Sequence, residues 1–346
     1  MATLKSLVDE TTNIKNELKT CHTNLKNNLV EKGVDASSSD KMATLIDKVK
    51  DVGLNIPKSV KPKGIWIDCD THSSYQSEYS DCAVVGNSAY IIGGTGSAKV
   101  NEEYNSITNT YTEHSNMNVS KTRISVCSVD NIIYIYGGGN STVLSYDTVT
   151  KTYTTVGTYF SGTLDLDMMT CVVGTDIYLM GGANSSSAKK DNYVYDTITN
   201  TYTQKASLLT SRVGKTGYLY NGRIYLIYGG TGNSPTVGCN KNIDCYNISN
   251  DTWTTVNTVN DGSRLSSGVV VNDNIYILGG GGSGSQTPFE CTRYNITSNT
   301  LEVIPSAMNL LEAYATCIIN NTIYVFRGNY VTTDVKSDTT HIFIPQ

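Results

Sequence analysis

The chain has 346 residues, of which 39% are apolar and only 16% are charged, and its formal net charge is −5. This composition is typical of a globular protein with an uncharged polar surface. The charge is uneven, because residues 1–63 carry 11 basic against 8 acidic side chains, whereas the remainder carries 15 against 23. The acidic balance of the larger part excludes general nucleic-acid binding, which depends on neutralising phosphates. No apolar run approaches a membrane span and no signal-peptide pattern begins the chain, so we expect neither membrane insertion nor secretion.

Residues 1–53 are predicted to be helical and to form an attachment or oligomerisation segment. Apolar residues on alternating three- and four-residue steps indicate a short coiled-coil seam; they are Leu4, Leu7, Ile14, Leu18, Cys21 and Leu25. A second helix is expected to begin near Ser38, and residues 54–63, which contain two prolines, form a linker. A homo-oligomer is therefore expected. The alternative is a helical hairpin that packs on the rest of its own chain.

Residues 169–203 contain four short β-prone runs separated by turn formers. The same order of features recurs along the chain. A tyrosine, apolar residues and a Gly-Gly pair are followed by a polar loop, a Tyr-Asp or Tyr-Asn turn, and usually an aromatic residue seven positions after that tyrosine. The first positions of the Gly-Gly pairs are 93, 137, 181, 229, 279 and 327, where Arg327 replaces the glycine in the last unit. A four-strand unit at this period is typical of a propeller blade.

This pattern resembles the kelch repeat, and the resemblance covers residues 64–346. It implies a mainly β, six-bladed propeller preceded by the helical segment. The last repeat lacks one strand, whereas residues 64–68, which include Trp66, stand alone before the first repeat. We therefore expect residues 64–68 to supply the outer strand of the last blade and close the ring, because an open ring would expose strand edges.

Four of the nine cysteines share one repeat position, in the first strand of a blade: Cys82, Cys127, Cys171 and Cys317. Gly217 and Gly268 occupy this position in two other blades. First strands converge near the axis of a propeller, so small residues fit there. Buried free thiols are the favoured interpretation. No Cys-x-x-Cys or zinc-type Cys/His spacing is present, and no metal or cofactor site is predicted.

The candidate ligand-binding residues precede the first strands, in the connections between blades. Arginines and aromatic residues occupy these connections: Arg123, Arg212, Arg264, Tyr159, Phe160 and Tyr314. Guanidinium groups suit carboxylates and phosphates, so an anionic glycan is the ligand class that we expect. The alternative is that each arginine only braces a loop. Lys189, Lys190 and Lys241 are taken to lie on the opposite face and to be the competing site.

No catalytic residues are predicted. A polysaccharide-cleaving enzyme needs two carboxylates that flank the scissile bond. Asp165 and Asp167 are the nearest candidates, but they lie two residues apart in one connection. A solvated turn is the favoured interpretation of this pair.

Residues 25–49 resemble a module found in tail and fibre proteins of bacteriophages and phage-tail-like bacteriocins of Gram-positive bacteria. The shared features are a leucine-rich helix, a Lys-Gly-Val turn, a Ser/Asp helix start and a Met-x-x-Leu-Ile helix. The resemblance implies a non-enzymatic receptor-binding protein of a virion tail or tail-like particle, assembled in the bacterial cytoplasm. Its partners would be a host cell-surface glycan or protein and, through the helices, other tail or baseplate proteins. By the same resemblance the homo-oligomer would be a trimer. The alternatives are a polysaccharide-degrading tail enzyme on the same propeller and a cytosolic kelch-type adaptor for a protein partner.

Overall fold

The computed structural model divides the chain into two units, Met1–Lys61 and Pro62–Gln346. It describes residues 64–158, 166–184, 187–214, 217–232, 238–259, 262–263, 265–281, 290–304, 311–330 and 335–345. The predicted helices and coiled coil of residues 1–53 lie outside these residues. Within the described ranges the regular elements are strands, and no helix there could span a membrane.

The described part of the second unit contains six four-stranded antiparallel sheets, and each of these sheets is one blade. Blade 1 comprises β2 (Asp81–Val85), β3 (Ser88–Ile92), β4 (Asn101–Asn105) and β5 (Thr110–Glu113). Blade 2 comprises β6 (Ile124–Val129), β7 (Ile132–Gly137), β8 (Thr142–Asp147) and β9 (Thr152–Thr158). Blade 3 comprises β10 (Met169–Val173), β11 (Asp176–Met180), β12 (Asn192–Asp196) and β13 (Thr201–Gln204).

The remaining three blades follow the same plan. Blade 4 comprises β14 (Tyr218–Tyr220), β15 (Arg223–Ile227), β16 (Asn242–Asn247) and β17 (Thr252–Thr258). Blade 5 comprises β18 (Gly268–Val271), β19 (Asn274–Ile277), β20 (Thr292–Asn295) and β21 (Thr300–Val303). Blade 6 comprises β23 (Ala315–Ile319), β24 (Thr322–Phe326), β27 (Thr339–Ile344) and β1 (Ile65–His72).

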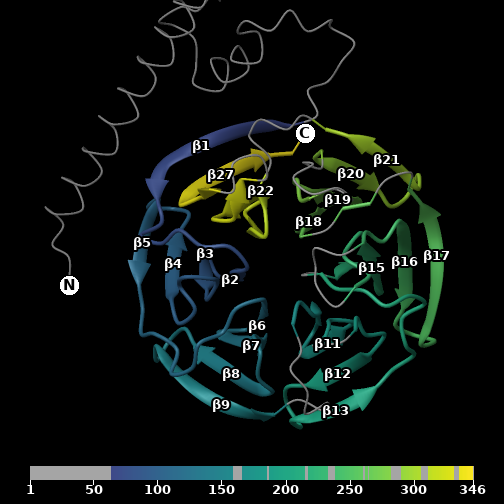
Figure 1. Cartoon of the computed structure of the whole chain (residues 1–346), viewed down its shortest axis with the longest axis horizontal. Helices are drawn as coiled ribbons and strands as arrows, with labels where there is room; N and C mark the ends of the chain where they lie inside the picture. Colours follow the sequence, from purple (N-terminus) through teal and green to yellow (C-terminus); the bar gives the residue numbers. More distant parts are fainter. Residues whose placement is uncertain are drawn as a thin grey trace, which may run out of the picture. The chain divides into compact units, whose positions relative to one another are not determined.

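The blades stand around a central axis, with the first strand of each blade innermost and the fourth at the perimeter (Figure 1). Because the strands within a blade are antiparallel, the loops between second and third strands lie on the same face as the connections between blades. We call this the connection face. The opposite face carries the tight turns between first and second strands and between third and fourth strands, and we call it the turn face. The mainly β, six-bladed architecture predicted from the repeat is confirmed.

The ring closes as predicted, with β1 as the outer strand of blade 6. It pairs with β27, so that Ile65 lies opposite Ile344 and Trp66 opposite Phe343. The rings of Trp66 and Phe343 are 5.0 Å apart between centroids. The strand continues to His72, beyond the predicted residues 64–68.

Blade 6 also carries a small sheet that the repeat pattern does not predict. It consists of β22 (Leu311–Glu312), β25 (Asn329–Tyr330) and β26 (Val335–Lys336). The segment between the second and third strands of this blade thus pairs with the connection that leads into the blade. Such pairing joins segments by backbone hydrogen bonds and has no signature in side-chain periodicity.

The Tyr-Asp and Tyr-Asn dipeptides end the third strands and build the turns into the fourth strands. The Oδ1 of Asp196 accepts hydrogen bonds from the backbone N–H groups of Ile198 (2.8 Å) and Thr199 (3.0 Å). Tyr195 is buried, and its hydroxyl donates to Oδ1 of Asn200 at 2.7 Å. The tyrosine therefore packs in the core while fixing a turn through its polar end.

The Gly-Gly pairs turn the chain out of the second strands and bring it against the next connection. Gly181 and Gly182 have φ values of 63° and 87°. The N–H of Gly182 donates to the carbonyl of Arg212 at 2.9 Å. A Cβ at Gly181 would lie 2.3 Å from that same carbonyl oxygen, so only glycine permits this approach.

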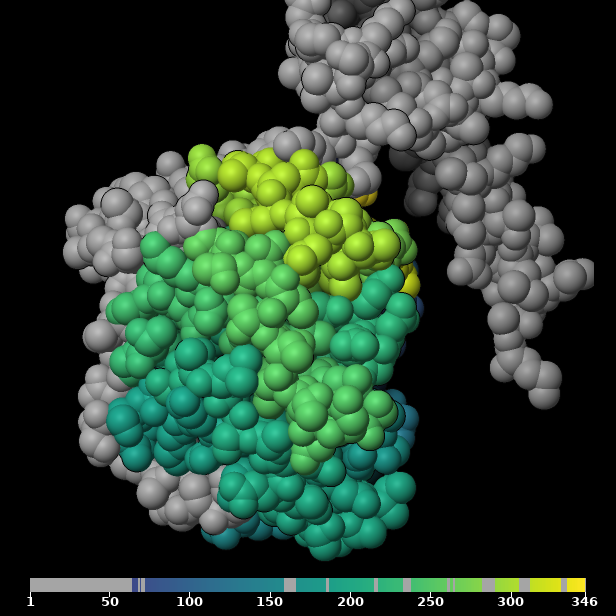
Figure 2. All heavy atoms as spheres, turned by 90° about the vertical axis from the view of Figure 1, so that its right-hand side faces the viewer, coloured from purple at the N-terminus to yellow at the C-terminus, as the bar shows by residue number. Residues whose placement is uncertain are grey.

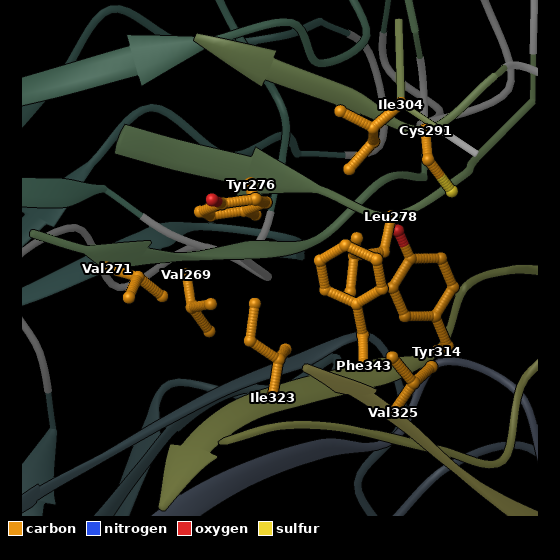
Figure 3. Packing of buried hydrophobic residues seen from close by; sticks show 10 residues of the cluster. All are labelled: Val269, Val271, Tyr276, Leu278, Cys291, Ile304, Tyr314, Ile323, Val325 and Phe343. Atoms are coloured by element: carbon orange, nitrogen blue, oxygen red, sulfur yellow. The ribbon is translucent and has the colours of Figure 1, made fainter. Parts of the chain in front are cut away.

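Apolar side chains fill the space between neighbouring blades. Between blades 5 and 6, for example, Tyr276 and Leu278 meet Tyr314, Val325 and Phe343 (Figure 3). From the side, the blades follow one another around the outer surface in chain order (Figure 2). The four predicted inner-strand cysteines are buried free thiols, as expected. A Cβ at Gly268 would lie 2.1 Å from the carbonyl oxygen of Tyr276, which confirms that space is short at this repeat position.

Candidate functional site

Backbone hydrogen bonds link the residues around the axis on the connection face, in five of the six steps from blade to blade. Each blade contributes one residue just before its first strand: Tyr79, Arg123, Asp167, Gly214, Leu265 and Ala313. The N–H groups of Arg123, Asp167 and Gly214 donate to the carbonyls of Tyr79 (3.3 Å), Arg123 (3.0 Å) and Asp167 (3.0 Å). Ala313 donates to Leu265 at 3.0 Å, and Tyr79 donates to Ala313 at 2.8 Å. We call these six residues the axial ring.

Five members of the axial ring have left-handed backbone conformations, although none of the five is glycine. Their φ values are 58° at Tyr79, 57° at Arg123, 51° at Asp167, 54° at Leu265 and 56° at Ala313. Such conformations cost free energy and persist only where the surroundings enforce them. Here the ring hydrogen bonds do so, and the result is a rigid platform at the centre of the connection face.

Arg123 lies on this platform, but its charge is paired. Its Nε donates to Oδ2 of Asp167 at 2.6 Å, and the side chain is 22% exposed, against 2% for Asp167. Asp167, one of the two carboxylates considered for catalysis, is therefore held by a guanidinium within the protein. Asp165 lies outside the described residues.

Arg212 is fully buried and does not reach the surface. It donates through one terminal nitrogen to Oδ2 of Asp244 at 2.7 Å and to the carbonyl of Asn242 at 3.1 Å. Burial lowers the pKa of Arg212 to about 10, and the charge of Asp244 acts in the opposite direction. The expectation that this guanidinium faces a ligand at the channel mouth is wrong, because the side chain braces the third strand of the next blade.

Tyr314 is also fully buried. Its hydroxyl donates to the carbonyl of Ser267 at 3.0 Å and accepts from the N–H of Ser267 at 3.1 Å. Burial raises the pKa of this phenol well above its ordinary value. Arg264, Tyr159 and Phe160 lie outside the described residues, so the ligand-binding role given to them stays a prediction.

The lysines taken as the competing site lie on the same face as the arginines. Lys189 and Lys190 belong to the loop between β11 and β12, and their carbonyls accept hydrogen bonds from Arg212 (3.1 Å) and Leu208 (2.9 Å). Lys241 occupies the corresponding loop of blade 4. The assignment of these lysines to the opposite face is wrong, because second-to-third-strand loops and blade connections share one end of an antiparallel sheet.

Among the residues that the structure describes, two buried cations, Lys121 and Arg327, were not predicted to be buried from the sequence. Lys121 donates from Nζ to the carbonyls of Gly137 (2.6 Å) and Thr142 (2.8 Å) and to Oδ1 of Asn140 (2.8 Å). Burial lowers the pKa of Lys121 to about 8. Like Arg212, this side chain braces the blade that follows it. The sequence feature that could have drawn attention to Lys121 is its position two residues before Arg123.

Arg327 occupies the place of a motif glycine, and its φ of 56° keeps the glycine-like turn. Its guanidinium is buried and bonds Oε2 of Glu102 at 2.8 Å and Oγ of Ser73 at 3.2 Å. Glu102 belongs to blade 1, and Ser73 directly follows β1. The arginine that replaces the motif glycine therefore forms an ion pair between the last blade and the first blade.

A central channel of about 390 Å³ runs between the six inner strands. Its lining residues follow the axial ring in each blade, so the channel lies on the turn-face side of that ring. The four repeat-position thiols line it, and burial raises the pKa of Cys171 to about 12. Among the described residues, no group of three or more His, Cys, Asp and Glu side chains is arranged to hold a metal ion.

The sequence matches the KLHDC2/KLHL20/DRC7 Kelch-repeats domain over residues 79–280, more than half of the chain. The chain belongs to the kelch-repeat family. A kelch relative from Xenopus tropicalis, "Kelch repeat and BTB domain-containing protein 8", is 33% identical over 97 residues, which are 27% of this chain and 15% of that protein. The chain thus spans only a small part of this curated relative.

The fold also matches a solved structure, "Structure of YjhT", with a TM-score of 0.68 and 13% sequence identity. The match covers 78% of this chain and 95% of that chain. At this identity the similarity establishes the fold alone. Kelch propellers of this family suggest a protein-interaction function.

Proposed function

We propose that this kelch propeller is a non-enzymatic recognition module whose partner binds on the connection face, around the axial ring. This proposal rests on the platform at the centre of that face, whose left-handed residues are held in place by hydrogen bonds between blades. A surface that is rigid before binding loses little conformational entropy when a partner docks. Tyr79 and Arg123 are the partly exposed side chains of this platform.

The electrostatics of this face favour a protein segment over an anionic glycan. Arg123 and Arg212 are neutralised by Asp167 and Asp244. Burial and the carboxylates of Glu78, Asp167 and Glu312 raise the pKa of Tyr79 to about 12. The neutral phenol of Tyr79 can thus donate a hydrogen bond to a partner at neutral pH. The described members of the axial ring therefore offer a neutral-to-acidic centre, which suits a protein segment better than an anionic polysaccharide.

The receptor-binding role in a phage tail or tail-like particle is the second candidate. It is favoured by the resemblance of residues 25–49 to tail and fibre modules, and it would place the propeller as the head that meets a host receptor. In that role the helical segment would hold the protein to the particle. The partner class distinguishes the candidates: a protein segment for an adaptor and a cell-surface glycan for a tail protein.

The test is a parallel screen of the purified full chain against a displayed random-peptide library and an array of bacterial cell-surface glycans. Arg123→Ala and Tyr79→Ala should each weaken binding of the selected ligand at least tenfold. The matched control is Lys151→Ala, which removes a partly exposed cation from the turn face. A ligand whose binding falls with Lys151→Ala but not with the two platform variants would refute the proposed face. Release of oligosaccharides from the glycans would refute the non-enzymatic assignment.

A further inference from the structure

The outer ladder of blade 6 carries exposed isoleucines on the strand that closes the ring. Ile65 and Ile67 flank Trp66 on β1, which lies at the perimeter of the propeller (Figure 1), and Ile344 lies opposite Ile65 on β27. Because side chains alternate along a strand, these three isoleucines share one face of the ladder. They are 44%, 44% and 36% exposed. We call Ile65, Ile67 and Ile344 the isoleucine corner.

The other five blades carry polar residues at these repeat positions. In each outer strand a threonine precedes the aromatic residue or leucine, and another threonine follows it, except that Glu302 follows in blade 5. An asparagine or aspartate lies opposite the first threonine. These pairs are Thr110 with Asn105, Thr152 with Asp147, Thr201 with Asp196, Thr252 with Asn247, and Thr300 with Asn295. Blade 6 has isoleucine at all three positions.

Formation of the strand does not explain the isoleucines. Threonine is also β-branched and suits a strand as well, and the core is already filled from the other face of the ladder by Trp66 and Phe343. Exposed isoleucines that stand singly, such as Ile107 and Ile198 in two turns, need no explanation. Three on one face of a ladder form a continuous apolar surface, which favours contact with another molecule.

The charge of the propeller favours a second copy of this chain as that molecule. Residues 64–67 and 342–345, which surround the corner, contain no charged side chain, whereas residues 64–346 carry 15 basic against 23 acidic side chains. Two such acidic propellers repel each other, so an uncharged corner is where they can approach at the least electrostatic cost. Apolar surface is also complementary to a copy of itself.

The position of the corner in the chain favours the same occupant. It begins directly after the linker of residues 54–63, which spans at most about 35 Å when extended. Association of residues 1–53 from two copies would therefore tether their corners and raise the effective concentration to about millimolar. Three isoleucines bury far less than the roughly 800 Å² per partner of a stable protein interface. The corner is thus suited to a contact between tethered copies.

We propose that the isoleucine corner packs against the same corner of another copy of this chain. The contact adds to the association predicted for residues 1–53 and rests on that prediction. Because the corner lies at the perimeter, it is separate from the axial ring and from the partner surface proposed there.

Sedimentation velocity of the full chain over a range of concentrations tests this proposal. Ile65→Thr with Ile67→Thr gives blade 6 the threonines of the other outer strands, and it should weaken self-association about tenfold because buried apolar area is lost. The matched control is Ile107→Thr with Ile198→Thr, which removes two exposed isoleucines from the turn face. The control should associate like the wild type, and far-UV circular dichroism should show that all three proteins are folded.

Cross-linking of the full chain measures the proximity of the corners directly. A short bis-maleimide should join two copies of Ile67→Cys about tenfold faster than two copies of Ile198→Cys, because packed corners raise the local thiol concentration. The wild-type chain gives the background from the native cysteines.

The proposal is overturned if the threonine variant associates like the wild type, or if both cysteine variants cross-link at the same rate. It is also overturned if the full chain is monomeric at every concentration. A thiol of Ile67→Cys that resists a monofunctional maleimide at every dilution has the same consequence, because the corner is then covered within a single copy.

Discussion

In blades 1, 3 and 5, the tyrosine near the end of the third strand and the asparagine five positions later form one structural unit. Tyr104, Tyr195 and Tyr294 donate to Asn109, Asn200 and Asn299 at 2.9, 2.7 and 2.8 Å, and each asparagine has a φ between 53° and 57°. Asparagine serves two purposes here, because it tolerates the left-handed conformation and accepts the phenolic hydrogen.

Two substitutions of Asn200 separate these purposes. Asn200→Gly keeps the conformation but loses the acceptor, and it should cost about 1 kcal/mol. Asn200→Ala loses both and should cost about 2–3 kcal/mol, because a left-handed alanine adds roughly 1–2 kcal/mol. Urea denaturation of the two variants measures the difference. Equal destabilisation would show that the backbone conformation carries no cost at this turn.

The turn carboxylates predict a specific acid response. Backbone N–H groups of Thr150 and Val149 lower the pKa of Asp147 from its ordinary 3.8, and those of Thr199 and Ile198 do the same for Asp196. A lowered folded-state pKa gives stability above the unfolded pKa and loses it as pH falls through the folded value. Asp147→Asn with Asp196→Asn should therefore flatten the fall in melting temperature below about pH 4. Parallel curves for the double variant and wild type would contradict this assignment.

At the scale of the element, the inner strands have little room for added volume at their small-residue position. Gly268→Ala should destabilise by about 1–3 kcal/mol or more, because the added methyl would overlap the carbonyl of Tyr276. Gly222 is the control, since a Cβ there meets nothing within 4 Å and only its φ of 69° opposes a side chain. Thermal melts of both alanine variants should rank Gly268→Ala as the less stable. The reverse order would mean that the inner strand shifts to make room.

The repeat was sufficient to predict the six blades, but it could not predict the small sheet of β22, β25 and β26 or the ion pairs. Tyrosines, Gly-Gly pairs and Asx turns recur because every blade needs the same turns and the same core, so their spacing is visible in sequence. Arg212 pairs with a carboxylate 32 residues away, and Arg327 pairs with one 225 residues away. Such partners depend on which blades become neighbours. For the same reason, the sequence suggested a free cationic cluster of three arginines. In the structure, Arg212 braces a blade and Arg123 belongs to the axial ring.

At the scale of the whole molecule, stability depends on closing the ring. Trp66 packs on Phe343, and Ser73 bonds Arg327, so residues 64–73 join the two ends of the propeller by packing and hydrogen bonds. Deleting residues 64–70 should therefore collapse the melting transition of the propeller. A chain that begins at residue 61 is the control for loss of the first unit, and it should melt like the full chain. An unchanged transition in the deletion variant would refute closure as a source of stability.

Assembly through the first 53 residues remains a prediction. Isolated helices of this length are marginal in water, so a coiled-coil seam there would need partner helices. Light scattering should give a homo-oligomer for the full chain, a trimer by the resemblance to phage fibre proteins, and a monomer for residues 60–346. If both are monomers, the segment instead serves to dock another protein.

The pairing of Ile65 with Ile344 means that the same ring could be formed by a chain that begins and ends elsewhere. These two positions face each other across one ladder, so a short peptide could join them and new ends could be cut elsewhere. A circular permutant opened at the Val173–Asp176 turn would then build the closing blade from one continuous segment. Closure would then move to blade 3, because β10 would come from the end of the permuted chain and β11, β12 and β13 from its beginning. The folding rate of such a permutant would report how much the natural order of the blades, rather than their contacts, governs the route to the closed ring.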